Sequence, residues 1–173
     1  MKQLVLLIFV FIFITGCAKL SIVSVNKEAM SSISAESIIF VPRFEGNSDF
    51  AEESTDYFIA ILESKVPNTI VHGSVLRTEQ TDISSAGNIA PLKTALSTAS
   101  DNGADILIMG KVTSHKTAEI LKGFSIIRVY SVQTGERLAN FPRPGGMLMG
   151  YSKHQAVMAA VKRTANDFAD SIR

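Results

Sequence analysis

Cys17 is the only cysteine of the chain and the residue whose position most clearly points to chemistry. It follows Gly16 directly, close behind an apolar run over residues 4–14 that holds no charge and no proline. That run is about half the length of a helix that crosses a hydrocarbon layer of roughly 30 Å. With Lys2 ahead of it, the run therefore predicts a cleavable export signal rather than a permanent membrane span.

The tetrad Ile14, Thr15, Gly16 and Cys17 resembles the lipobox of bacterial lipoproteins, with isoleucine where leucine is commoner. The resemblance implies that the precursor is cleaved before Cys17, that its thiol carries a diacylglycerol and that the new amine receives a fatty acid such as palmitate. Several acyl chains anchor a protein durably. Ala18 after the cysteine, in place of aspartate, implies the outer membrane with the domain facing the periplasm. The alternative is a free thiol beside an ordinary cleavage site.

Other residues with catalytic or metal-binding side chains are scattered. The three histidines have no close partner in sequence: His72, His115 and His154. Glu52, Glu53 and Asp56 could exchange protons with a substrate, but the solvated face of a helix explains them better. The chain has no Gly-x-Ser-x-Gly elbow and no Gly-Lys-Ser/Thr phosphate loop. We therefore expect no catalytic site, no metal and no cofactor.

Residues 141–151 form the segment with the most unusual composition. Prolines and glycines surround an apolar group and a tyrosine: Met147, Leu148, Met149 and Tyr151. One interpretation is a loop or edge strand whose apolar residues tuck under the sheet. The other is a loop that docks a partner, since exposed methionine and tyrosine suit adaptable contacts.

Charge limits the classes of partner. Removal of the signal with Lys2 leaves 16 basic and 16 acidic residues, with no run of either sign. This balance argues against nucleic acid, which requires a basic stripe. It also argues against a polybasic surface that binds lipid headgroups.

The chain divides into three parts by composition. Residues 1–16 are expected to be the signal peptide, residues 17–36 a lipidated amino terminus and tether, and residues 37–173 a single periplasmic domain. The tether is rich in serine and alanine, with one short strand expected near residues 20–25. Fully extended, such a tether reaches at most roughly 70 Å, so the domain stays near its membrane.

Hydrophobic patterns predict the elements of the domain. Strands are expected at residues 37–42, 69–73, 105–112, 124–132 and 137–141, with a further hairpin around 114–123 and a break at the prolines and glycines of 142–146. Helices are expected after Asp49 as N-cap, from Pro91 to the Asn102-Gly103 stop, and after a capping box of Ser152 and Gln155. This order, β-α-β-α-β-β-β-α, predicts an α/β (α+β) fold with a mixed sheet of about five strands and three helices packed on it.

The order of motifs also resembles a family of periplasmic domains. Gly103-Ala104-Asp105 through Gly110 and the segment from Val129 to Glu136, with Ser131 where aspartate is usual, carry the resemblance. The superfamily includes the curli-secretion lipoprotein, the amino-terminal domain of the Tol-Pal propeller protein and lipoprotein activators of penicillin-binding proteins. The chain is closer to short bacterial lipoproteins that share a domain of unknown function. These motifs are backbone devices and bear on the fold.

The resemblance and the residues together favour a non-enzymatic lipoprotein of the outer membrane. It would bind an envelope protein or itself, or act in envelope assembly. The alternative is a lipoprotein that binds a small ligand or a cell-wall fragment, and an enzyme comes third. A curli-type membrane barrel is not expected, since it needs two long amphipathic hairpins for which the chain has no room.

Overall fold

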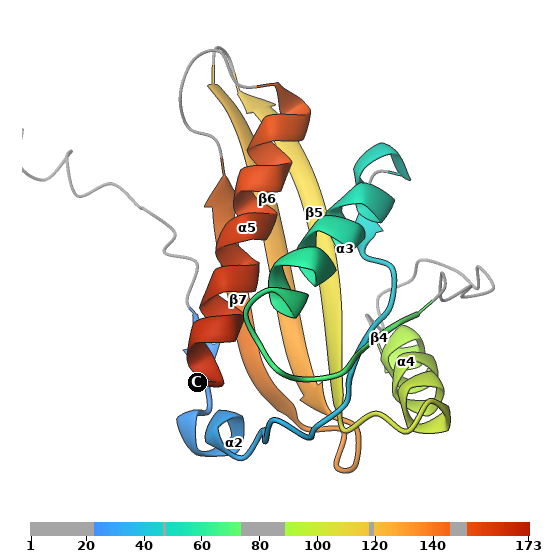
Figure 1. The fold of residues 1–173 in the computed structure, drawn as a ribbon. Coiled ribbons are helices and arrows are strands. Elements are labelled where there is room, and N and C mark those ends of the chain that lie inside the picture. The colour runs from blue at the N-terminus through green and yellow to red at the C-terminus, as the bar shows by residue number, and fades with distance from the viewer. Residues whose placement is uncertain (1–22, 47, 74–88, 118–119, 146–151) are drawn as a thin grey trace, which may run out of the picture.

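The computed structural model describes residues 23–46, 48–73, 89–117, 120–145 and 152–173. The expected signal peptide, Cys17 and the group from Met147 to Tyr151 lie outside these residues. Eleven elements follow one another along the chain (Figure 1). They are β1 (Ser24–Val25), α2 (Lys27–Ser31), β2 (Ile39–Val41), β3 (Glu45–Gly46), α3 (Ser48–Glu63), β4 (Ile70–His72), α4 (Ile89–Asp101), β5 (Ile106–Thr117), β6 (Ile120–Ser131), β7 (Arg137–Gly145) and α5 (Lys153–Ser171).

The strands form one mixed sheet in the order β1-β7-β6-β5-β2-β4, with β3 paired to β5 beside this path. Strand β2 runs parallel to β4 and β5, whereas β5, β6 and β7 are antiparallel neighbours. The predicted class, a mixed sheet with helices packed on it, is confirmed. The short strand expected near residues 20–25 is β1. Strand β3 and helix α2 were not predicted, because two to five residues are too few to give a periodic pattern.

Helices α3 and α5 cover one face of the sheet, and the main core lies beneath them (Figure 1). The other face carries a smaller core, in which Ala95 and Ala99 of α4 pack against Phe40, Leu107 and Tyr130. Strand β2 is buried on both sides because its side chains alternate between the two cores. No described helix is long and apolar enough to cross a membrane.

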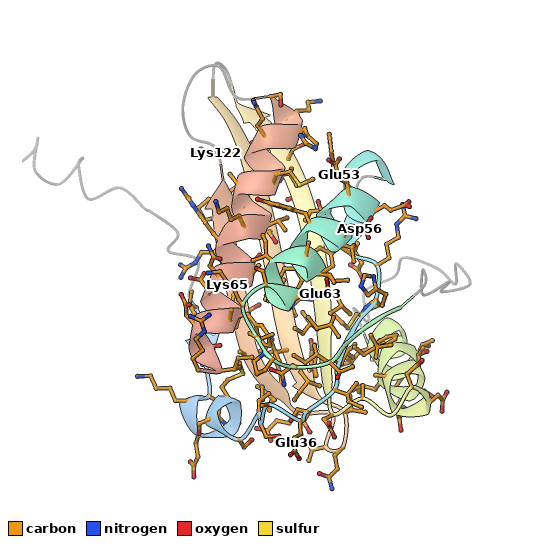
Figure 2. The ribbon with its side chains drawn as sticks, viewed as in Figure 1. Glu36, Glu53, Asp56, Glu63, Lys65 and Lys122 are labelled. Atoms are coloured by element: carbon orange, nitrogen blue, oxygen red, sulfur yellow. The ribbon has the colours of Figure 1, made fainter. Side chains whose placement is uncertain are left out.

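The predicted helix signals are largely confirmed. Ser152 caps α5, and its capping box with Gln155 is complete. Helix α4 stops at Gly103, whose φ of 69° favours glycine. Asp49 was predicted to be the N-cap of α3 but is its second residue, since the helix begins at Ser48. Acidic side chains Glu53, Asp56 and Glu63 are exposed along α3 (Figure 2).

Helix α5 contacts β6 and β7 backbone to backbone. Gly123 and Gly145 face each other across these strands. A Cβ atom on Gly123 would collide with the backbone of Ala156, and one on Gly145 with the backbone of Ala156 and Ala160. Glycine on the sheet and alanine on the helix therefore allow a close approach that larger side chains exclude.

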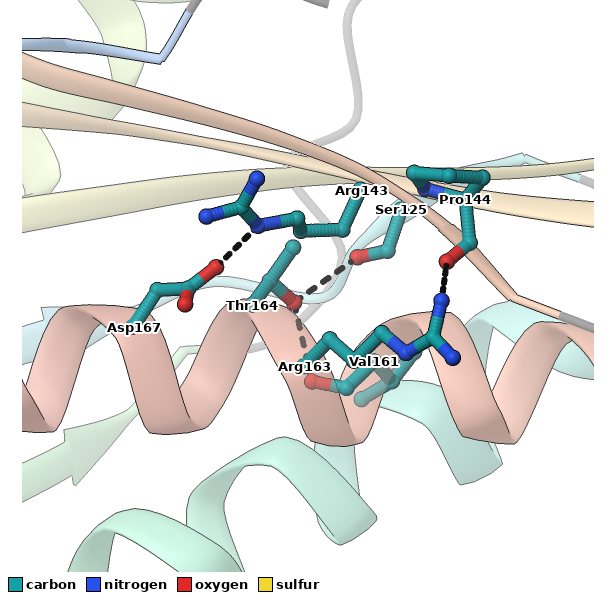
Figure 3. Close-up of polar contacts among 7 residues, drawn as sticks. All are labelled: Ser125, Arg143, Pro144, Val161, Arg163, Thr164 and Asp167. Atoms are coloured by element: carbon teal, nitrogen blue, oxygen red, sulfur yellow. Dashed lines mark hydrogen bonds and ion pairs between the residues drawn. The ribbon is translucent and has the colours of Figure 1, made fainter.

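Polar contacts hold the same interface further along the helix (Figure 3). Arg143 of β7 forms an ion pair with Asp167 of α5. Arg163 donates to the carbonyl oxygen of Pro144 at 2.7 Å. Between them, the buried hydroxyls of Ser125 and Thr164 lie 3.1 Å apart. Each buried polar group here has a partner, as burial requires.

Residues 142–146 were predicted to break the sheet, and this was wrong for all that lie in the described part of the chain. Strand β7 continues to Gly145. Beyond Asn140 its outer side pairs with no described strand, because β1 covers only Ala139 and Asn140. Pro142 and Pro144 are two residues apart, so their ring nitrogens point to the same side. An edge strand accommodates proline in this way.

The predicted tether contributes to the core. Met30 of α2 is fully buried and Ile33 nearly so. Strand β1 pairs with β7, which ties Ser24 and Val25 to the sheet. The chain thus enters the folded body near Val23, which packs against the main core. The limits of the three predicted parts stay predictions, but the described part of the predicted tether, from Val23 onward, belongs to the folded domain.

Two neighbouring buried hydroxyls of α3 give a matched test of packing. Ser54 Oγ has no hydrogen-bond partner in the described residues. Thr55 Oγ1 accepts from the backbone N–H of Phe44 at 2.9 Å and donates to the carbonyl of Ala51 at 2.7 Å. Ser54→Ala removes an unpaired polar group, so we expect a gain of about 0.5–1 kcal/mol in unfolding free energy. Thr55→Val strands a buried N–H and should cost about 1–3 kcal/mol.

Urea unfolding monitored by circular dichroism measures both values on one protein preparation. A loss of stability in Ser54→Ala would mean that this hydroxyl is satisfied after all.

Candidate functional site

The residues that the sequence singled out fall into separate places. The lipobox, Ile14 to Cys17, and the candidate docking group Met147, Leu148, Met149 and Tyr151 lie outside the described residues. Their roles stay predictions. Phe141, at the start of the same segment, is buried in the main core in the middle of β7.

A cavity of about 300 Å³ gathers several of the polar candidates. It lies at the carboxyl ends of the parallel strands β2 and β4, beside α3. This position is typical of ligand sites in α/β sheets. The charged or titratable residues that line it come from three elements: Arg43, Glu52, Asp56 and His72.

Charges of both signs meet in this cavity. Arg43 Nη2 lies 3.0 Å from Glu52 Oε2, and the two side chains are 30% and 69% exposed. His72 Nε2 lies 3.9 Å from Glu63 Oε1. The groups are well solvated, so each ion pair contributes little to folding. The site therefore offers polar and ionic contacts to a small ligand that carries both an amine and an acid.

Arg43 was not singled out from the sequence. The feature of the sequence that could have identified Arg43 is its position directly after strand β2 and Pro42, where the strand ends. Of the predicted acids, Glu52 and Asp56 reach the cavity, and Glu53 does not. Consecutive helix residues point in directions about 100° apart, which separates Glu53 from its neighbour Glu52.

Glu53 instead joins α3 to α5. Its Oε1 lies 2.7 Å from His154 Nε2, and the ring of Phe50 packs near that imidazole. This contact connects the second turn of α3 with the first turn of α5. His115 lies elsewhere again, on the sheet beside Phe124. The described residues hold no group of three histidine, cysteine, aspartate or glutamate side chains that could hold a metal ion.

A second, wider hollow opens at the other end of the sheet, near Glu36 (Figure 2). Several serines are among the residues that line it, together with acidic and apolar side chains. Of its three carboxylates, Glu36, Asp105 and Glu136, that of Asp105 already accepts a hydrogen bond from the backbone N–H of Ile38 at 2.8 Å. The Asp105 carboxylate thus stabilises the contact between the segments that lead into β2 and β5. The hollow therefore gives no clear ligand site.

Beyond α4, no described helix covers the sheet face opposite α5. We define the open face as the side chains of β5, β6 and β7 beyond α4: Lys111, Thr113, His115, Lys122, Phe124, Ile126, Arg128, Pro142 and Pro144. Cross-strand register places them on one side of the sheet. Helix α4 packs on this side only at its other end, around Leu107 and Tyr130.

The alternation of side-chain types along residues 122–128 could have predicted this face from the sequence. Every second residue, from Lys122 through Phe124 and Ile126 to Arg128, points to the open side. The intervening residues Gly123, Ser125 and Ile127 are buried beneath α5. Cationic and apolar side chains thus alternate with the core residues along one strand.

Comparison with known proteins bears on the fold. No family model matches the chain, and no curated protein matches it in sequence. Among solved structures it is similar to a PelC dodecamer from Paraburkholderia phytofirmans, with a TM-score of 0.60 at 8% identity over 86% of this chain and 95% of that one. At this identity the likeness shows the fold alone, a domain of mixed sheet and helices.

Two other structures overlap the chain more loosely. They are the LpoB C-terminal domain from Salmonella enterica (17% identity, 70% of this chain, 93% of that one, TM-score 0.46) and lipoprotein GNA1162 from Neisseria meningitidis (14%, 79%, 99%, 0.45). Their TM-scores lie below 0.5 and do not establish a shared fold. The family that the motifs resemble stays a prediction.

Proposed function

We propose that the chain is a lipid-anchored envelope protein, held by Cys17 at the outer membrane with its domain in the periplasm. It acts without catalysis, by binding an envelope protein, and copies of itself are the first partner to test. The observation that carries the proposal is the lipobox placed six residues before Val23, where the chain joins the sheet. The domain is then held at the membrane surface, where partners also anchored there reach it.

The fold adds support for self-association. PelC, with a similar fold, is described as a dodecamer. A domain tethered close to a membrane diffuses in two dimensions, and its effective concentration toward its own copies rises accordingly. Cross-linking of the lipidated protein in native membranes tests this. A ladder of multimers is expected, and a single band at every cross-linker concentration would leave a different protein as the partner.

The cavity favours a second candidate function, the binding of a cell-wall fragment. Muropeptides carry both amines and carboxylates, which the cation Arg43 and the acids Glu52 and Asp56 would complement. This candidate rests on the cavity alone and is independent of self-association.

The anchor is tested by Cys17→Ser, with Ala18→Ser as the matched control. Without the thiol no diacylglycerol can be attached, so we expect an uncleaved precursor that takes up no labelled palmitate. Ala18→Ser should be cleaved and labelled as the native chain is. Metabolic labelling followed by membrane fractionation measures both properties. Lipid label that survives Cys17→Ser would refute the anchor.

The docking loop is tested by a triple variant, Met147→Ala with Leu148→Ala and Met149→Ala. Truncation of a buried leucine or methionine to alanine typically lowers the free energy of unfolding by about 2–5 kcal/mol. Truncation of an exposed one changes it by about half a kcal/mol at most. We expect a melting temperature near that of the native protein and a loss of cross-linked multimers. A drop of many degrees would assign these residues to the core instead.

The cavity is tested by Arg43→Ala combined with Asp56→Asn, and Glu36→Gln at the far end of the sheet is the control. Because the cavity charges are well solvated, we expect the double variant to keep its stability within about 1 kcal/mol. It should lose any melting-temperature rise that muropeptides cause in the native protein, while Glu36→Gln keeps that rise. No rise in the native protein would remove this candidate.

A further inference from the structure

The open face concentrates positive charge. Lys111, Lys122 and Arg128 lie on it with the imidazole of His115. The described residues place one carboxylate at its border, that of Glu45, whose strand β3 pairs with β5 at Lys111. In the described part of the chain, none of the three cations forms an ion pair, whereas Arg43 and Arg143 on the helix side are both paired.

Apolar side chains lie between these cations. Phe124 and Ile126 occupy the centre of the face, and Pro142 and Pro144 extend it across β7. The rings of Phe124 and His115 are 6.0 Å apart, edge to face. Aromatic and aliphatic groups flanked by lysine and arginine are the composition of surfaces that rest in a membrane interface.

The anchor enters the domain beside this face. Strand β1 is antiparallel to β7, with Ser24 opposite Asn140 and Val25 opposite Ala139. Val23, before Ser24, therefore lies toward the end of β7 that carries Pro142 and Pro144. Six residue steps separate Cys17 from Val23, which is about 20 Å when fully extended. Some surface of the domain must consequently lie within that distance of the lipid headgroups.

We propose that the open face is this surface, and that it docks on the anionic headgroups of the membrane that holds Cys17. The inference rests on the proposed anchor. A weak electrostatic contact suffices, because the acyl chains have already brought the face to the bilayer. The open face of a second copy is a poor binding partner for this face, since the cations of the two faces would repel one another. The acidic flank of α3, with Glu53, Asp56 and Glu63, then points away from the membrane (Figure 2).

This proposal revises the expectation, drawn from the even charge balance, that no lipid-binding basic surface exists. Net charge sums over the whole chain and carries no information on position. Strand alternation sends Lys122 and Arg128 to one side of the sheet, while most acids of α3 and α5 lie on the other. A neutral protein can thus present a cationic face.

The experiment uses the lipidated mature chain in vesicles. Once Cys17 is acylated no other thiol remains, so Thr113→Cys places one fluorescent label on the open face and Ala60→Cys places one on the exposed side of α3. Each is reconstituted in neutral phosphatidylcholine vesicles and in vesicles with one third phosphatidylglycerol. Quenching by nitroxide-labelled lipid measures how close each label lies to the bilayer.

We expect the Thr113 label to be quenched strongly in the anionic vesicles and weakly in neutral ones or at high salt, with the Ala60 label weakly quenched throughout. Each cation near an anionic surface is worth about a fivefold change in the docking equilibrium. Lys111→Glu with Lys122→Glu and Arg128→Glu should therefore abolish the difference between vesicles. Lys65→Glu with Lys153→Glu and Lys162→Glu on the helix side carries the same charge change and should preserve it.

Equal quenching at both positions in anionic vesicles would overturn the proposal. So would a Thr113 label shielded from aqueous quencher in detergent micelles, which would mean that another segment of this chain, 74–88 or 146–151, covers the face. Protection that needs added membrane proteins would assign the face to a protein partner. Flotation of the unlabelled chain with vesicles reports the anchor separately, so failure of the anchor and failure of the face are distinguished.

Discussion

The close contact of α5 with β6 and β7 is the constraint on which the rest of the domain depends. At Gly123 and Gly145 the helix backbone meets the sheet with no side chain between them. This approach buries Val157, Val161 and Phe168 in the main core and brings Thr164 to Ser125. It also places α3 against α5, with Glu53 and His154 in contact. Once α5 occupies one side of the long hairpin, the other side is left for different contacts.

The short link between anchor and fold has a similar consequence for function. Because β1 pairs with β7 and Met30 is buried, little chain remains free to act as a spacer. A protein that reaches across the periplasm needs a long flexible linker. With the proposed anchor at Cys17, this domain would instead stay at the surface of its membrane, which favours partners in the same membrane. The position also favours contact between one face of the sheet and lipid headgroups.

The three longer helices, the longer strands and their order could be predicted from the sequence. Their signals are local: the capping box at Ser152, the stop at Gly103 and the apolar strand from Ile106. The errors fell where a distant neighbour decides. Pro142 and Pro144 stay in β7 because its outer side has no described strand partner there, and α2 is stabilised by burial of Met30 among residues far along the chain. Local pattern cannot report such partners.

The sequence by itself predicts the export signal and the lipobox at Cys17, because such motifs are read in an extended segment before folding. It also determined the class of fold, through hydrophobic periodicity. Tertiary structure alone decided which charges meet. It brought Arg43 to Glu52 and Asp56 at the ends of two parallel strands, and it separated Glu53 from them. It also gathered Lys111, Lys122 and Arg128 on one face of a chain with balanced charge. The physical reason is that cavities and surfaces combine residues from different elements, and their spacing in sequence carries no information on that pairing.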